Sequence, residues 1–355
     1  MPVRVPTESR SPAVFPTPLK GTIHRDHWSS DVLQGNPWND PVDRELPVYV
    51  PPSGATEGIP LLLLLSGYSG RGSQHFQEPT FLHETVVQCL DRLILRGACP
   101  PVVLAAPDGR TTLGGSQYLN STATGRYEDY VVDEVLSRLR EKYRTGPTAI
   151  LGKSSGGYGA LVLALRHPEL FPVAGSIAGD AYFEYCYLPE FPAAVRQLRT
   201  EGGPEALLRR ALSGPLHDFR PGTPVAQAFE TMAYASCYSP VETAPGEFDL
   251  PFDLETGEVR PEVWSRWLAW DPVRMFRSEA YRPALKRLRY LYLDGGTRDE
   301  FFLDLGSRVL AAEARRAGAA VAWHEYAGGH FDVGERYERM LPALARAALG
   351  TTPEP

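Results

Sequence analysis

Residues 148–161 read TAILGKSSGGYGAL, an apolar, partly β-branched run followed by the pentapeptide GKSSG at 152–156 and a stretch of helix-forming residues. This order predicts a strand, a sharp turn and a helix. Such a turn is known as a nucleophile elbow, and it raises a serine hydroxyl above the end of a sheet. The flanking glycines fit that turn because a Cβ at either position would clash with neighbouring backbone. The segment therefore predicts an α/β fold and makes Ser154 the candidate nucleophile.

The composition of the 355-residue chain excludes several classes of protein. Its net charge is −7, and its Lys and Arg residues are scattered rather than clustered, so nucleic acid is not an expected partner. The longest apolar run, around residues 61–65, is far shorter than the roughly 20 residues of a membrane-spanning helix, so no membrane association is expected. Residues 1–19 are rich in Pro and polar side chains and lack the apolar core of a secretion signal. We expect a flexible leader and a cytoplasmic protein.

The four cysteines, at 89, 99, 186 and 237, show no metal-ligand spacing. In a reducing compartment they are expected to be buried thiols, although a bridge between Cys186 and Cys237 stays open. Neither a metal nor an organic cofactor is expected.

Short apolar runs bounded by turn residues alternate with amphipathic stretches along the chain, which is typical of a mostly parallel sheet covered by helices on both faces. We expect one α/β domain over residues 20–350 and a short tail at 351–355. The first two strands are expected to form an antiparallel pair before the parallel core begins. The expected strands are 44–50, 60–66, 101–106, 148–152, 173–178, 288–294 and 320–326, and the expected helices are 81–95, 127–143, 155–166, 301–317 and 336–349.

A long segment interrupts this alternation. Residues 180–282 are rich in aromatic side chains and Pro, with a helical pattern near 204–213. A connection of this length within a compact domain is usually functional, so we interpret it as a cap or lid inserted over the sheet. The alternative is a structural excursion packed against the side of the domain. If it is a cap, its aromatic side chains, beginning with Tyr182, are expected to line an apolar substrate pocket.

An activated serine needs a base, and the base needs an orienting carboxylate, which in this kind of fold follow the serine in the order acid, then histidine. The turn GGTRDE at 295–300 supplies Asp299, with Asp294 and Glu300 as alternatives. His330 follows a Gly-Gly pair after the last expected strand. His324 is its competitor, but it lies within that strand. We therefore predict Asp299 as the acid and His330 as the base.

The negative charge that develops during acyl transfer needs backbone N–H donors. One candidate is the amide of Ser155, at the start of the helix after the elbow. The other is the amide of Tyr68 in the loop Gly67-Tyr68-Ser69-Gly70, whose glycines allow close approach of the backbone to a ligand. This loop could also be a plain flexible turn. A phosphate-binding role is not supported, because the chain lacks both the P-loop and the dinucleotide fingerprints.

These motifs, taken in order, resemble the α/β-hydrolase esterases grouped around esterase D, enterochelin-type esterases, feruloyl esterases and antigen 85 acyltransferases. The resemblance covers residues 20–350 and rests on RELPVYVPPS, LLLLLSGYSG, APDGRTTLGGSQYLNSTATGRYEDYVVDEV, GKSSGGYGAL, LDGGTRDEFFL and AGGHF. It implies a triad of Ser154, Asp299 and His330, with the Tyr68 and Ser155 amides as oxyanion donors. It also implies that residues 108–130 pass near the active face, so that Tyr118 or Asn120 contacts substrate.

Two features depart from the family pattern. Ser155 stands where these enzymes often have Met or another apolar residue, and the segment after Asp180 is longer than in the compact members. We expect a serine hydrolase that cleaves a small-molecule carboxylic ester through an acyl-enzyme. The alternatives are a thioesterase of the S-acylglutathione type, an acyltransferase, or a non-enzymatic binding protein on the same fold. The sequence leaves the natural substrate and the oligomeric state open.

Overall fold

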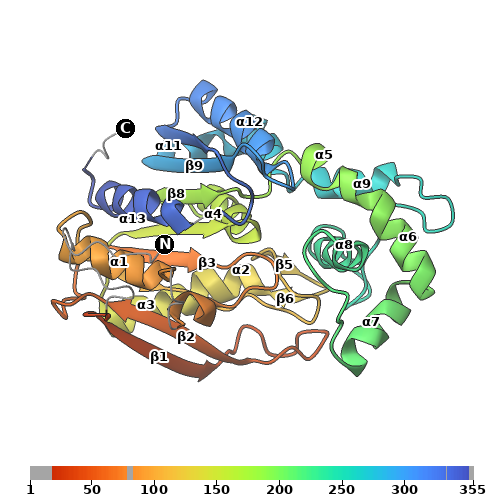
Figure 1. Ribbon diagram of the computed structural model, residues 1–355, viewed down its shortest axis with the longest axis horizontal. Helices are drawn as coiled ribbons and strands as arrows, with labels where there is room; N and C mark the ends of the chain where they lie inside the picture. The colour runs from red at the N-terminus through yellow and green to blue at the C-terminus, as the bar shows by residue number, and fades with distance from the viewer. Residues whose placement is uncertain (1–17, 78–82, 333, 352–355) are drawn as a thin grey trace, which may run out of the picture.

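The computed structural model describes residues 18–77, 83–332 and 334–351, and the expected leader, most of the tail and the first residues of the expected helix 81–95 lie outside them. An eight-stranded sheet runs through the molecule in the order β1-β2-β4-β3-β7-β8-β9-β10 (Figure 1). Its strands are β1 Thr22–Ser29, β2 Asp43–Val50, β3 Leu61–Leu65, β4 Val103–Ala105, β7 Thr148–Lys153, β8 Val173–Ile177, β9 Tyr290–Gly296 and β10 Val321–Tyr326. A separate two-stranded sheet consists of β5 Asn120–Ser121 and β6 Gly125–Arg126.

In the eight-stranded sheet the neighbouring strands β4, β3, β7, β8, β9 and β10 are all parallel, which confirms the expected mostly parallel α/β sheet. The pairing expected of the first two predicted strands is wrong. β2 does not pair with β3, because β4 lies between them and pairs antiparallel with β2 through Val48 and Tyr49. β3 is five buried leucines, and such a strand needs a neighbour on each side, which β4 and β7 provide.

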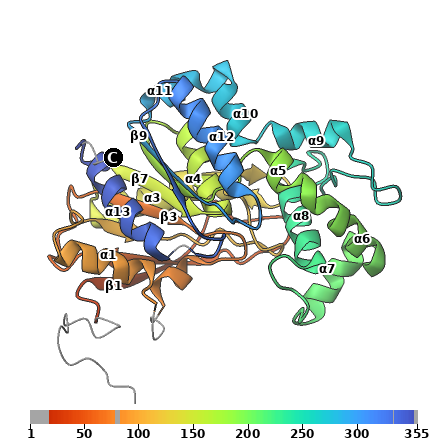
Figure 2. The ribbon, with the colours of Figure 1, turned by 45° about the horizontal axis from the view of Figure 1, so that its top comes forward.

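Helices fill the connections between the parallel strands and cover the sheet (Figures 1 and 2). They are α1 Val86–Leu95, α2 Tyr127–Asp129, α3 Leu136–Tyr143, α4 Ser155–Arg166, α5 Phe183–Cys186, α6 Phe191–Glu201, α7 Pro204–Ser213, α8 Pro224–Tyr238, α9 Pro261–Leu268, α10 Pro272–Arg277, α11 Arg282–Arg287, α12 Leu303–Arg316 and α13 Gly334–Ala348. Short 3-10 turns occur at η1 Gly72–Phe76, η3 Leu188–Glu190 and η4 Glu279–Tyr281, and a π-helical stretch, η2 Tyr130–Val135, joins α2 to α3.

Two adjacent residues of β8 show that helices lie on both faces of the sheet. A Cβ added to Gly175 would meet Leu344 of α13, whereas the side chain of Ser176 faces Gly157 of α4. Successive residues of a strand point to opposite faces, so α13 and α4 cover opposite sides. Figures 1 and 2 both show α1 beside α13, in the same layer. The expected two-sided cover is therefore confirmed.

The chain between β8 and β9 forms seven helices, α5 to α11. Figure 1 shows α5 to α9 grouped beyond one end of the sheet, whereas α10 and α11 return to pack against α12 and α4. The helical pattern expected near 204–213 is α7. Among the described residues, no helix combines the length and the apolar character needed to cross a membrane.

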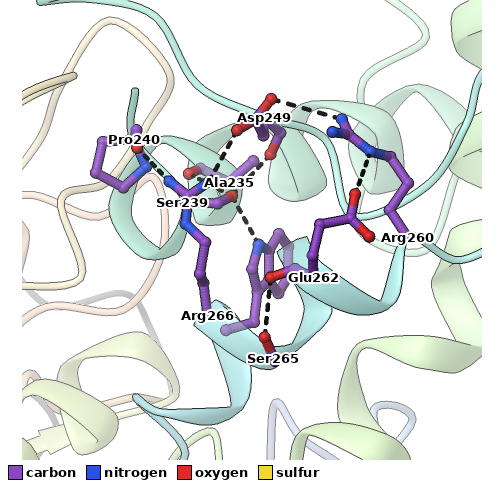
Figure 3. Close-up of polar contacts among 9 residues, drawn as sticks. Ala235, Ser239, Pro240, Asp249, Arg260, Glu262, Ser265 and Arg266 are labelled. Carbon is purple, nitrogen blue, oxygen red and sulfur yellow. Dashed lines mark hydrogen bonds and ion pairs between the residues drawn. The ribbon is translucent and has the colours of Figure 1, made fainter. Parts of the chain in front are cut away.

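A polar network joins the end of α8 to α9 within this segment (Figure 3). Asp249 accepts a hydrogen bond from Arg266 at 2.8 Å and one from Arg260 at 3.5 Å. Ser239 accepts from the indole N–H of Trp267 at 2.9 Å and donates to the carbonyl of Asp249 at 2.7 Å. These side-chain bonds act together with backbone hydrogen bonds around two isolated β-bridges to hold the irregular stretch between the two helices. Cys186 and Cys237 are both buried free thiols.

Candidate active site

Ser154 stands alone between the last residue of β7 and the first residue of α4. Its backbone has φ 57° and ψ −131°, a conformation that non-glycine residues rarely adopt and that is found mostly where structure imposes strain at functional sites. A Cβ on Gly156 would lie 2.1 Å from the carbonyl oxygen of Leu65, and one on Gly152 would lie 2.3 Å from the backbone of Gly156. The glycines on both sides are therefore required for the turn, as the sequence predicts.

His330 and Asp299 are brought together from the loops that follow β10 and β9. The Nδ1 atom of His330 lies 2.9 Å from Oδ2 of Asp299, and both side chains are buried. The other carboxylate oxygen of Asp299 accepts the backbone N–H of Phe301 at 2.9 Å. The ring of Phe301 in turn packs edge-on against His330, with 4.9 Å between the ring centroids. The carboxylate and the imidazole are thus held on two sides.

The three residues considered as alternatives to Asp299 and His330 contact other groups. Glu300 accepts the backbone N–H of His330 at 2.7 Å, so it holds the histidine loop rather than the imidazole ring. Asp294 is buried against Arg336, whose Nε donates to it at 2.7 Å. His324 lies on β10, 5.0 Å from the ring of Tyr292 between centroids. The geometry therefore favours Asp299 and His330 over these three.

Ser154 and His330 line the same cavity, which has a volume of about 160 Å³. The loops after β3, β7, β8, β9 and β10 all contribute to its wall, and the carboxyl ends of parallel strands are where α/β folds collect their ligands. The remainder of the wall comes from α5, α8 and the connections near residues 187–190 and 219–221.

The two expected oxyanion donors are the amides of Tyr68, in the loop after β3, and of Ser155, directly after Ser154. Ser69 N–H donates to Gly114 at 3.1 Å, and Gly70 N–H donates to Gly67 at 3.0 Å. Within the described ranges, the amides of Tyr68 and Ser155 have no such acceptor. Ser155 is the first residue of α4, where N–H groups lack intrahelical partners and the helix dipole favours an anion. The side chain of Tyr68 is fixed by its hydrogen bond to the Leu113 carbonyl at 2.7 Å.

The family model described as "Putative esterase" matches residues 41–338. The chain belongs to this esterase family. It is accordingly a carboxylic ester hydrolase, and its sheet is that of the α/β-hydrolase fold.

Solved structures with the same fold include several esterases. A ferulic acid esterase is 18% identical, with a TM-score of 0.57 over 94% of this chain and 99% of the other. An S-formylglutathione hydrolase from Agrobacterium tumefaciens is 16% identical, with a TM-score of 0.56 over 94% and 97%. A ferric enterobactin esterase from Salmonella typhimurium is 16% identical, with a TM-score of 0.54 over 94% and 60%. At these identities the likeness concerns the fold.

The three side chains expected to contact substrate lie elsewhere in the esterase. Tyr118 is buried, and its hydroxyl donates to the carbonyl of Ser66 at 2.8 Å. Asn120 bonds Asp129 at 2.7 Å on the surface. Tyr182 has its ring against Tyr185, 4.5 Å away between centroids. In the described part of the chain none of the three is among the residues that line the cavity at Ser154.

Charged residues that sequence reasoning did not select do line the cavity. Asp180 follows β8, and its carboxylate accepts hydrogen bonds from Tyr187 at 2.9 Å, Gln117 at 3.1 Å and Ser155 at 3.3 Å. Burial raises the pKa of Asp180, and these bonds oppose that rise. Its position directly after a parallel strand could have indicated it, as it did for Asp299.

Lys153, beside Ser154, also lines the cavity. Its ammonium lies 4.7 Å from the ring centroid of Phe331. Burial lowers the pKa of Lys153 to about 8, although the carboxylates of Asp299, Glu300 and Asp180 act in the opposite direction. A positive charge thus stands near the candidate acid. In the residues that the structure describes, no cluster of His, Cys, Asp and Glu has the arrangement of a metal site.

Proposed function

We propose that this esterase cleaves small-molecule carboxylic esters through a covalent acyl-enzyme on Ser154, with His330 as the base and Asp299 as its orienting acid. The observation that carries the proposal is the 2.9 Å contact between His330 and Asp299 at the same cavity that holds Ser154 in its strained turn. The family match supports ester hydrolysis, and the geometry supplies the residues that would perform it.

The partners of the two ring nitrogens of His330 determine the path of the proton. Because Nδ1 of His330 faces Asp299, Nε2 remains to accept the proton of Ser154 as its Oγ attacks the ester carbonyl. The amides of Tyr68 and Ser155 would stabilise the tetrahedral oxyanion, and each such donor is typically worth about 2.7–4 kcal/mol. The C–O bond to the alcohol then breaks, and the leaving alkoxide takes the proton from His330. Water attacks the acyl-serine in the second half by the same route.

We propose further that the segment 180–282 acts as the cap over this site. Helices α5 and α8 and the chain near residues 187–190 and 219–221 contribute the part of the cavity wall that the loops of the sheet do not supply. This supports a role in substrate selection over that of a side excursion. Thioester cleavage and acyl transfer share the same acyl-enzyme, so a panel of acyl, aryl and thioesters with and without alcohol acceptors would rank them.

The test of the proposed chemistry is Ser154→Ala, measured with p-nitrophenyl acetate. We expect kcat to fall by about 10⁴-fold or more, with an unchanged thermal unfolding midpoint. Ser265→Ala is the matched control, because Ser265 is an exposed serine of α9 outside the cavity. Its kcat should equal that of the unmodified protein. A Ser154→Ala variant with activity within tenfold of the control would contradict the proposal.

A further inference from the structure

Two glutamates from the segment 180–282 line the cavity beside the candidate nucleophile. Glu190 ends η3, and Glu230 lies in the middle of α8. Each is only 9% exposed to solvent. Both side chains are thus nine-tenths buried while facing the space that also contains Ser154 and His330.

Neither carboxylate has a partner within the described residues. No hydrogen bond or ion pair of the described chain involves the side chain of Glu190 or Glu230, whereas Asp180 nearby is held by three donors. Burial raises the pKa of both glutamates, the charge of Asp180 raises both further, and the charge of Glu190 adds to the rise in the pKa of Glu230. Buried acids are normally paired, so two unpaired ones at a cavity wall are costly to the fold.

Such a cost is explained if a ligand supplies the missing positive charge. A metal ion does not suit the site, because the carboxylates form no group able to hold one in the part of the chain that is described. The neighbouring wall contains the rings of Tyr187, Tyr234 and Phe219, whose faces attract cations of organic type. Lys153 does not supply this positive charge. Its ammonium group interacts with the charges of Asp299, Glu300 and Asp180 and lies over the ring of Phe331.

We propose that Glu190 and Glu230 bind a positively charged nitrogen group of the substrate, so that the esterase prefers esters that carry an ammonium group. This inference rests on the proposed function of the Ser154 cavity. The two carboxylates would contribute charge, and the aromatic rings would enclose the alkyl groups on the nitrogen. Glu190 and Glu230 are then determinants of specificity rather than participants in the acyl-transfer chemistry.

The test compares pairs of esters in which a trimethylammonium group is replaced by a neutral tert-butyl group of the same shape. On the acyl side the pair is p-nitrophenyl 4-(trimethylammonio)butanoate and p-nitrophenyl 5,5-dimethylhexanoate, and on the leaving-group side it is acetylthiocholine and S-(3,3-dimethylbutyl) thioacetate. In at least one pair we expect kcat/KM to favour the cation by about tenfold to a hundredfold. The double variant Glu190→Gln, Glu230→Gln should bring that ratio to one or below. Glu242→Gln, Glu247→Gln removes two exposed charges of the same segment and should keep the ratio of the unmodified protein.

A binding measurement keeps the inference separate from the proposed chemistry. Butyltrimethylammonium should raise the unfolding midpoint of the unmodified protein and of Ser154→Ala, but not that of the Glu190→Gln, Glu230→Gln variant. Cleavage of neutral and cationic esters at equal rates, together with no change of midpoint on adding butyltrimethylammonium, would overturn the inference while leaving the role of Ser154 intact. Loss of cation preference in the Glu242→Gln, Glu247→Gln control would also overturn it, since long-range charge would then be the cause.

Discussion

Oδ2 of Asp299 lies 2.9 Å from Nδ1 of His330, although the two residues are 31 positions apart and come from loops after different strands. Two further contacts maintain this relationship. Phe301 N–H fixes the carboxylate, and Glu300 holds the backbone of His330. The pair is therefore preorganised by its own loops, which is the condition for a histidine to act as a base without first being ordered by substrate.

Replacing Asp299 should affect catalysis far more than folding. Asp299→Asn keeps the size of the side chain but removes the charge that orients the imidazole and stabilises its protonated form. We expect kcat for p-nitrophenyl acetate to fall by about 10⁴-fold, with little change in KM. Steady-state kinetics on the folded variant would measure this. A rate within tenfold of the unmodified protein would transfer the role to another carboxylate.

Asp294 should show the opposite behaviour. It is fully buried and bonded to Arg336 and Tyr292, so Asp294→Asn leaves a buried guanidinium without its counter-charge. Breaking such a pair typically costs about 3–5 kcal/mol. We expect a lower urea midpoint for Asp294→Asn but a kcat within a few fold of normal. An unchanged midpoint combined with a large fall in kcat would make Asp294, rather than Asp299, the acid of the site.

The absence of a side chain at Gly156, two residues after Ser154, is required by the space available. A Cβ at Gly156 would lie 2.1 Å from the Leu65 carbonyl of β3, so one backbone segment must move. Gly156→Ala should lower the free energy of unfolding by about 3 kcal/mol or more. Gly334→Ala is the control, because no atom of the described residues lies within 4 Å of its Cβ position at the start of α13. Equal unfolding midpoints for the two variants would contradict the steric account.

The unpaired glutamates make stability depend on pH. Burial raises the pKa of Glu190 and Glu230 above the ordinary value of 4.5, so between that value and the raised one the folded state binds more protons than the unfolded state. Stability is therefore lost as pH rises through this window, and below pH 4.5 the effect vanishes. Each pKa unit of difference between the folded and unfolded states corresponds to about 1.4 kcal/mol in the free energy of unfolding. Glu190→Gln, Glu230→Gln should unfold at a higher temperature than the unmodified protein at pH 8, with a smaller difference at pH 5. The same difference at both values would show that the glutamates are not the titrating groups.

The parts of the fold that sequence predicts are those with strong local patterns. The strand-turn-helix around Ser154 follows from its glycines, and the loops of Asp299 and His330 follow from their place after apolar strands. Sequence does not predict β1, because its residues TIHRDHWS are mostly polar and partly exposed, as suits an edge strand. The predicted pairing of β2 is wrong because the strand that separates it from β3 lies some 40 positions later in the chain.

Side-chain direction is harder to predict than chain order. Tyr118 has a φ of 57°, and its ring packs on Gly159 inside the domain instead of facing the cavity. No local sequence pattern predicts that backbone conformation for a non-glycine residue. Glu190 and Glu230 come from a segment without strand-end positions, so their meeting at the cavity depends on how η3 and α8 pack.

The most direct test of the central claim is to locate the covalent adduct. The unmodified protein, Ser154→Ala and His330→Ala would each be treated with a fluorophosphonate, digested and analysed by peptide mass spectrometry. We predict one adduct per chain on Ser154 in the unmodified protein, none in Ser154→Ala and strongly slowed labelling in His330→Ala. An adduct on a different serine, or equal labelling of the His330→Ala variant, would contradict the proposal that Ser154 is the nucleophile activated by His330.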